Sequence, residues 1–413
     1  MYGFQTLVAI FFACVFAASS TLRCSAADPD TRLARMLAST NEAVRLKAIA
    51  GLQQDPERCL LALTDLVSVA KSEATSTPAN GVVRPSEVQL LNLIGSVHRP
   101  ETEQLLIESL DAPHPGIAMI AANALGENQV TGAIAALKRQ IERPEFQLSY
   151  GFRFNLIRSL ALMKHPDAIE YLSELRSKVD GQLRFEVEKL LANVNEFDFQ
   201  GDSQRFANWQ KARESKIVLT SAGSESEARE RMALGRSQQY YGIDIQAKRM
   251  MFIIDNSGSM KEMDGGMSRL HRAKYELVRA IEQLPSDAEF AITFYSSSVH
   301  QWQNVLVTAT DENKREAIIF IDRLGFGNQT NTYGALRQSL EFDSNLEAVF
   351  LLTDGRPTTG DIVAPHAIID DIMHRNRFRH LKFNTIGIAL DFDTDRFLKT
   401  LAEMSGGEFR KAG

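Results

Sequence analysis

Residues 250–255 constrain this chain more than any other stretch, because five apolar residues run without a break into a carboxylate. An unbroken apolar run of this length is typical of a strand buried on both faces of a parallel sheet. Ser257 and Ser259 follow on either side of a glycine. The ligand crevice of an open α/β sheet lies beyond the carboxyl ends of its strands. We therefore expect Asp255, Ser257 and Ser259 to offer hard oxygen atoms there, which suit Mg²⁺, Ca²⁺ or Mn²⁺.

The remainder of the C-terminal half alternates apolar strands with amphipathic helices. Buried strands are predicted at 290–294, 348–352 and 382–389, and helical spacing separates them. This alternation predicts a mostly parallel sheet with helices on both faces. Thr330 lies just before one predicted helix, and Asp354 follows the strand at 348–352. Three loops at one edge of the sheet should therefore converge on one point.

The pattern Asp-x-Ser-x-Ser, together with this threonine and second aspartate, resembles the metal-ion-dependent adhesion site of the von Willebrand factor type A domain. The resemblance covers residues 243–413 and implies a doubly wound α/β domain. It also implies that the bound ion, Mg²⁺ or else Ca²⁺ or Mn²⁺, takes its last ligand from an Asp or Glu carboxylate of a protein partner. The chain departs from the pattern at Asn256, where an apolar residue is common, and at Gln329, where a second glycine often stands. The resemblance assigns five ligands: Asp255, Ser257, Ser259, Thr330 and Asp354.

Residues 28–199 have apolar positions at helical spacing and contain internal repeats. Equivalent apolar positions at Ile94, Leu125, Leu160 and Leu191 are separated by steps of 31, 35 and 31 residues. Self-similarity at this period indicates a helical solenoid, in which no single repeat buries its own apolar face. The segment resembles short HEAT-like repeats. Such a stack could bind a partner or only space the other domain, and the sequence favours neither reading.

Predictions for the two remaining segments, residues 1–27 and 200–242, rest on their composition. Residues 7–18 form an apolar run of 12 residues, and small residues at 25–27 follow it. This run is short for a membrane span and typical of a secretory signal. We therefore expect residues 1–27 to direct export to the cell exterior, periplasm or cell envelope. The processed chain is expected to contain no membrane span. Residues 200–242 are rich in polar residues and are predicted to be a flexible linker, with Trp209 as an exception that could dock.

Charge and motif content narrow the functional classes. The formal net charge is −6 and no basic stripe is visible, so nucleic acid is not an expected partner. No catalytic motif supplies a base to Ser257 or Ser259, which argues against a serine hydrolase. The leading hypothesis is a secreted, non-enzymatic binding or adhesion protein with the helical repeats as scaffold or second binding surface. The alternative is an intracellular accessory factor of an ATPase or chelatase-type complex, which the export signal disfavours.

Overall fold

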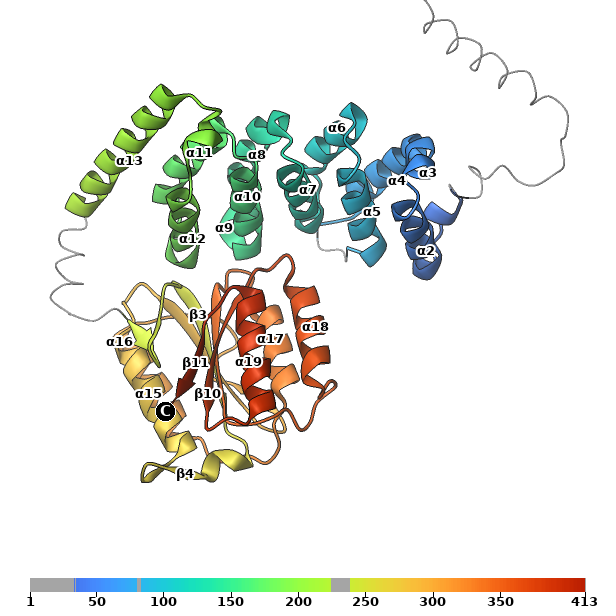
Figure 1. The fold of residues 1–413 in the computed structure, drawn as a ribbon. Coiled ribbons are helices and arrows are strands. Elements are labelled where there is room, and N and C mark those ends of the chain that lie inside the picture. Colours follow the sequence, from blue (N-terminus) through green and yellow to red (C-terminus); the bar gives the residue numbers. More distant parts are fainter. Residues whose placement is uncertain (1–32, 34, 80–82, 224–237, 413) are drawn as a thin grey trace, which may run out of the picture.

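The computed structural model describes residues 33, 35–79, 83–223 and 238–412, and it has a helical part followed by an α/β part (Figure 1). The expected signal segment, residues 1–27, lies outside the described residues. Within the described part of the chain, no helix is both long enough and apolar enough to cross a membrane.

The helical part is a row of short antiparallel helices with one continuous apolar core. Six of the helices described in this part of the chain begin at a proline, which is tolerated in the first turn because its missing N–H has no partner there. The helices are α2 (Glu42–Gln53), α3 (Pro56–Leu61), α4 (Leu63–Ser76), α5 (Pro85–Gly95), α6 (Pro100–Ser109), α7 (Pro115–Glu127), α8 (Ile134–Arg139), α9 (Pro144–Leu148), α10 (Tyr150–Leu162), α11 (Pro166–Leu175), α12 (Gly181–Ala192) and α13 (Ser203–Gly223).

Close contacts between successive helices recur with the period seen in the sequence. A Cβ at Gly95 of α5 would lie 2.8 Å from the Cβ of Ala124 in α7. One repeat later, a Cβ at Gly126 of α7 would lie 2.6 Å from the Cα of Ser159 in α10. Ala124 and Ser159 occupy equivalent positions in their repeats. The helical region is thus consistent with stacked helical repeats, and the glycines permit the close approach.

The segment expected to be a linker is structured at both ends. Helix α13 starts at Ser203, and the indole of Trp209 is buried in the helical core against Phe199 and Phe206. Tyr240, in β1 (Gln239–Tyr240), is buried in the core of the α/β part. A low mean apolar content predicted flexibility here. Trp209, noted in the sequence as an exception that could dock, is buried, because a large aromatic ring supplies enough apolar area to dock a short segment.

The α/β part is a seven-stranded sheet with helices on both faces, which confirms the predicted fold class. Its strand order is β11-β10-β9-β3-β6-β7, and β8 also pairs with β6. All pairings are parallel except those of β7 and β8 with β6. The strands are β3 (Arg249–Asp255), β6 (Glu289–Tyr295), β7 (Val299–Gln301), β8 (Val307–Thr308), β9 (Ala348–Thr353), β10 (Lys382–Ile388) and β11 (Phe409–Ala412), and two small hairpins add β1 with β2 (Ile243–Asp244) and β4 (Met263–Asp264) with β5 (Met267–Ser268).

The central strand β3 is buried on both faces. Met250, Phe252 and Ile254 pack into the core beneath α15 (Arg269–Glu282) and α16 (Asp311–Arg323). Met251 and Ile253 pack on the other face, beneath α17 (Thr332–Phe342), α18 (Pro365–Asn376) and α19 (Phe392–Ser405). Burial of both faces explains why the apolar run of β3 does not alternate with polar residues.

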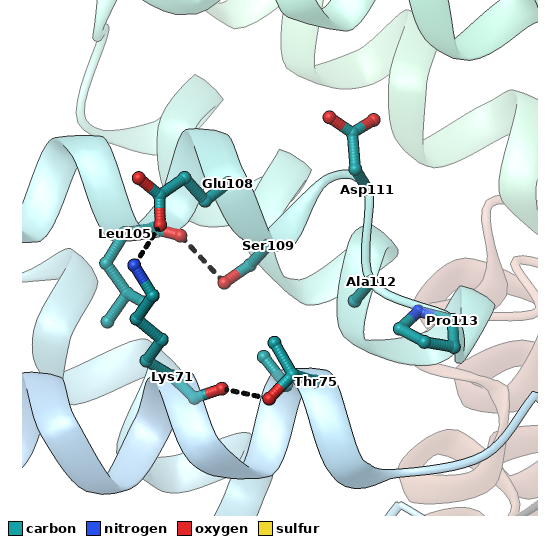
Figure 2. Close-up of a pocket in the computed structure, with 9 residues that line it drawn as sticks. Lys71, Thr75, Leu105, Glu108, Ser109, Asp111, Ala112 and Pro113 are labelled. Atoms are coloured by element: carbon teal, nitrogen blue, oxygen red, sulfur yellow. Dashed lines mark hydrogen bonds and ion pairs between the residues drawn. The ribbon is translucent and has the colours of Figure 1, made fainter.

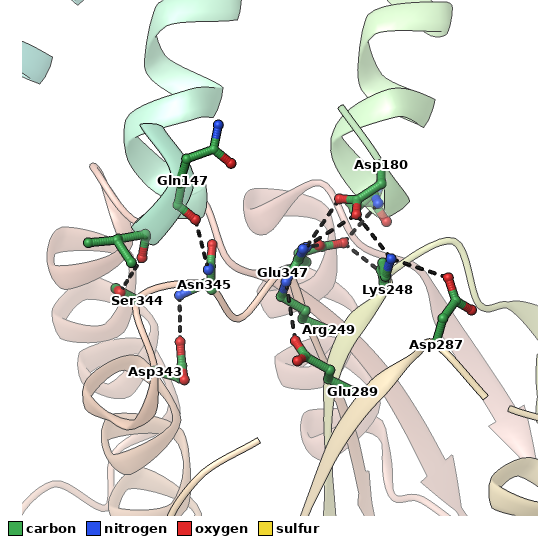
Figure 3. A network of polar contacts seen from close by, with 12 residues as sticks. Gln147, Asp180, Lys248, Arg249, Asp287, Glu289, Asp343, Ser344, Asn345 and Glu347 are labelled. Carbon is green, nitrogen blue, oxygen red and sulfur yellow. Dashed lines mark hydrogen bonds and ion pairs between the residues drawn. The ribbon is translucent and has the colours of Figure 1, made fainter. Parts of the chain in front are cut away.

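The helical part packs against the edge of the sheet where β3 and β9 begin. Glu347, directly before β9, is fully buried and accepts hydrogen bonds from the backbone N–H groups of Gln182 (2.9 Å) and Lys248 (3.0 Å) (Figure 3). The guanidinium of Arg249 pairs with Glu347 and also with Asp180, at 3.2 Å. A buried carboxylate at this contact is therefore matched by a cation and by two amides that come from both parts of the chain.

A second set of contacts closes the same interface. A Cβ at Gly151 of α10 would lie 2.2 Å from the carbonyl oxygen of Phe378, so the two backbones touch there. The Asn155 side chain donates to the same carbonyl at 3.0 Å, and His380 stacks on Phe154 with 4.4 Å between ring centroids. The opposite edge of the sheet, where β3 and β9 end, faces away from the helical part (Figure 1).

Candidate metal centre

Asp255 ends β3 as a fully buried carboxylate at the edge of the sheet remote from the helices. It accepts hydrogen bonds from the Ser257 N–H at 2.8 Å and the Thr353 hydroxyl at 2.6 Å. No ion pair with a described residue reaches it. Burial raises the pKa of Asp255 to about 6, because these hydrogen bonds only partly replace the lost water. The carboxylate is held in place but its charge is poorly compensated.

Ser257, Ser259 and Asp354 continue from Asp255 as a chain of oxygen atoms. The two serine hydroxyls are 3.1 Å apart, and the Ser259 hydroxyl donates to Asp354 Oδ1 at 2.7 Å. Asp354 follows β9, which pairs with β3, so the ends of neighbouring parallel strands bring both aspartates to one edge. The structure thus places four of the five expected ligand residues in one hydrogen-bonded group.

The loop that contains Thr330 is bonded to the loop that contains Ser257 and Ser259. The Gly258 N–H donates to the Asn328 carbonyl at 2.9 Å, and the Gly327 N–H donates to the Asn256 carbonyl at 2.7 Å. These bonds tie the loop before α17 to the loop after β3. The Thr330 side chain is buried, and the backbone N–H of Thr330 donates to the Thr358 hydroxyl at 2.8 Å. Thr330 therefore borders the group, although its hydroxyl makes no hydrogen bond to the other four of these described residues.

The departure at Asn256 has a local explanation. Its side-chain amide donates to the Gly325 carbonyl at 2.9 Å, and its N–H donates to the Tyr295 carbonyl at 2.9 Å. A polar residue here fastens the Thr330 loop to the sheet, so the position serves the same site through a different contact.

Sequence reasoning missed Arg269, the first residue of α15. Its guanidinium pairs with Asp354 Oδ2 at 2.8 Å and with Glu262 Oε2 at 2.7 Å, and the side chain is only 14% exposed. The available signal was its place directly after the helix-capping Ser268, at the same edge of the sheet. Thr353 was also missed, although it directly precedes Asp354 and its hydroxyl holds Asp255.

The side chains at this edge supply the oxygen ligands that a hard divalent cation prefers. Two carboxylates, two serine hydroxyls and a neighbouring threonine form a donor set made only of oxygen, which Mg²⁺, Ca²⁺ and Mn²⁺ prefer. The described residues contain no group of three or more His, Cys, Asp or Glu side chains that could hold a metal, so a cation here would depend on the hydroxyl oxygens as well as on the two aspartates. A cation beside Asp255 would supply the positive charge that this buried carboxylate lacks.

Exposed apolar side chains stand on the loops of this sheet edge and are here called the rim of the site. Met263 and Met267 stand on the β4–β5 hairpin, with exposed fractions of 68% and 39%. Arg272 braces the hairpin by pairing with Asp264 at 2.7 Å. The others lie on the loop before α17, the loop after β9 and the start of α19: Phe326, Val363 and Phe392. A polar centre inside an apolar rim is typical of a protein-binding surface.

A separate cavity of about 150 Å³ lies between α4 and α6 in the helical part (Figure 2). Its polar lining is already engaged: Lys71 pairs with Glu108 at 2.8 Å, and the Ser109 hydroxyl donates to the Leu105 carbonyl at 2.7 Å. The Asp111 carboxylate accepts from Gln140 at 2.8 Å. This cavity offers no group comparable to Asp255.

Comparison with known proteins identifies the class of the C-terminal part. The von Willebrand factor type A domain family matches residues 250–356, which include Asp255, Ser257, Ser259, Thr330 and Asp354. The chain therefore contains a von Willebrand factor type A domain, as the sequence motif indicated.

Individual relatives match part of the chain. Human von Willebrand factor A domain-containing protein 3B is 31% identical over 159 residues, which are 38% of this chain and 11% of that protein. Mouse inter alpha-trypsin inhibitor heavy chain 4 is 26% identical over 180 residues, 41% of this chain and 18% of that protein. The chain thus spans less than a fifth of the length of these relatives. Among solved structures, mussel byssus proximal thread matrix protein 1, described with a zinc-occupied MIDAS motif, aligns with a TM-score of 0.32 and 15% identity over 40% of this chain and 43% of that one.

Proposed function

We propose that this protein is a non-enzymatic binding protein that captures a protein partner through a divalent cation in its type A domain. Five residues would hold the cation: Asp255, Ser257, Ser259, Thr330 and Asp354. The observation that carries this proposal is the fully buried Asp255, a carboxylate with no cationic partner among the described residues, next to a chain of hydroxyl oxygens. The cation, preferably Mg²⁺, would supply positive charge and an open coordination position for a carboxylate of the partner.

The rim of the site supports a protein as the partner. A small carboxylate would need only the polar centre, whereas Met263, Met267 and Phe326 expose apolar surface that a protein segment can cover. The arrangement of the two parts also supports capture, because the helical part packs on the opposite edge and leaves the site open (Figure 1). The helical repeats then act as a scaffold or a second binding surface.

We further propose that the protein acts outside the cytoplasm. This part of the proposal rests on residues 1–27, whose apolar run and small residues are typical of an export signal.

Affinity capture with the full chain tests this function. Partners retained in Mg²⁺ should be released by EDTA and should be absent from the Asp255→Ala column. The matched control is Asp361→Ala, which removes an exposed carboxylate from the loop that also carries Asp354, and it should retain partners as the wild type does. Identical capture by all three proteins, with and without EDTA, would refute the metal-bridged mechanism.

A further inference from the structure

Two arginines at the start of α15 have similar partners and different positions. Arg272 pairs with Asp264 in the β4–β5 hairpin and contacts none of the expected metal ligands. Arg269 pairs with Glu262 at the base of the hairpin and also with Asp354. Only Arg269 therefore places its charge directly on a residue of the metal centre.

The Asp354 carboxylate has both oxygens engaged. Ser259 donates to Oδ1 at 2.7 Å, while Arg269 holds Oδ2 at 2.8 Å. The guanidinium is mostly buried, so water screens its charge only weakly. Counting Asp255, Asp354 and Arg269, the protein contributes one net negative charge to the centre. Glu262, the other partner of Arg269, is 64% exposed, so water screens its charge. A divalent cation would raise the total to one net positive charge.

We infer that Arg269 is a positioning residue that sets the charge and the ligand preference of the loaded centre. Its guanidinium fixes Asp354 and keeps one positive charge beside the cation. This lowers the affinity for the metal and raises the affinity of the loaded centre for an anionic oxygen ligand. Without Arg269, the two aspartates would neutralise a divalent cation completely, and a partner carboxylate would gain much less on binding. The inference rests on the proposed function, which already places a partner carboxylate at the cation, and adds Arg269 as the residue that sets the strength of this preference.

The metal alone provides the first test. Mn²⁺ titration of the full chain by calorimetry should show that Arg269→Gln binds Mn²⁺ about tenfold more tightly than the wild type, since a positive charge next to the ligand set is removed. Arg272→Gln loses the same charge from the neighbouring turn and should keep an affinity within about twofold of the wild type. Arg269→Lys keeps the charge and should behave as the wild type does.

Acetate provides the second test, as a probe for the partner carboxylate. The water-proton relaxation rate of protein-bound Mn²⁺ falls when acetate displaces a coordinated water. Arg269→Gln should require roughly tenfold more acetate for half of this change than the wild type or Arg272→Gln, because its loaded centre is electrically neutral. Thermal unfolding monitored by circular dichroism checks that each variant is folded.

The outcomes separate the two ideas. If the wild type binds Mn²⁺ and Asp255→Ala does not, the proposed function stands. If Arg269→Gln and the wild type then have equal Mn²⁺ and acetate affinities, the role of Arg269 is refuted alone. A wild type that binds no Mn²⁺ would overturn both. A variant Arg269→Gln that binds Mn²⁺ more weakly would show that the guanidinium is needed only to hold Asp354 in place.

Discussion

Two buried carboxylates lie at opposite edges of the same sheet, and their surroundings differ. Glu347, before β9, is bonded to Arg249 and to backbone amides from the helical part and from the start of the sheet. Asp255, at the end of the adjacent β3, is bonded among the described residues only to the Thr353 hydroxyl and the Ser257 N–H. Burial raises the pKa of both.

This difference distinguishes an assembly contact from a binding site. A buried charge that is fully paired holds two pieces of structure together, and it has no capacity left for a ligand. A buried charge that is only partly compensated costs free energy until a cation arrives. Glu347 joins the two parts of the molecule at one edge, whereas Asp255 at the other edge can still gain a cation as its partner.

The largest expected effect on stability comes from removing Glu347 at the edge of the sheet that packs against the helical part, here called the paired edge. Glu347→Ala leaves the Arg249 guanidinium without its buried partner and should lower the free energy of unfolding by about 3–5 kcal/mol. Urea unfolding of the full chain measures this loss. The control is Glu289→Ala, which removes a partly exposed partner of the same arginine, 3.3 Å away, and should cost less than about 1 kcal/mol. Equal losses in the two variants would contradict the assignment of Glu347 as the central contact.

The same interface should make stability depend on pH through His380. Burial, with a smaller contribution from Arg158, lowers the pKa of His380 to about 4. Between this value and the ordinary histidine pKa near 6.5, the unfolded chain binds a proton that the folded chain does not, so stability falls as the pH is lowered through that window. The loss should reach roughly 3 kcal/mol by pH 4. His380→Gln should show a flatter dependence over that range, and an identical slope in both proteins would remove His380 as the cause.

A smaller effect, on partner affinity, is expected at the rim of the edge that carries Asp255, here called the open edge. Met263→Ser combined with Met267→Ser removes exposed apolar surface and should change folding stability by less than about 0.5 kcal/mol. Affinity for a partner recovered in Mg²⁺ should fall roughly fivefold, measured by surface plasmon resonance. Met404→Ser removes a similarly exposed methionine from the end of α19 and serves as the control. Unchanged affinity in the double variant would exclude the hairpin from the binding surface.

The sequence alone predicted much of the open edge and little of the paired one. The unbroken apolar run of β3 predicted a doubly buried strand, and strand order then brought Asp354 and the Thr330 loop to Asp255. The position of Arg269 after the capping Ser268 places it at this edge, but its contact with Asp354 depends on how the β4–β5 hairpin folds back.

The paired edge is set by tertiary packing. Glu347 directly precedes an apolar strand and has no local pattern that distinguishes it from a solvated residue. Its partner Gln182 lies 165 positions earlier in the chain. Helix α13 was not predicted because residues 200–242 have a polar average composition, although Trp209 was noted as an exception that could dock.

The most direct test of the central claim compares the melting temperatures of wild type and Asp255→Asn at neutral pH, in EDTA and in saturating Mg²⁺. In EDTA the variant should be the more stable by about 1 kcal/mol, because it no longer buries an uncompensated charge. Mg²⁺ at about 100 times its dissociation constant should stabilise the wild type by about 2.7 kcal/mol and the variant hardly at all. Mg²⁺ is therefore expected to reverse the order of the two melting temperatures. The same order in both buffers, with no shift of the wild type, would contradict it.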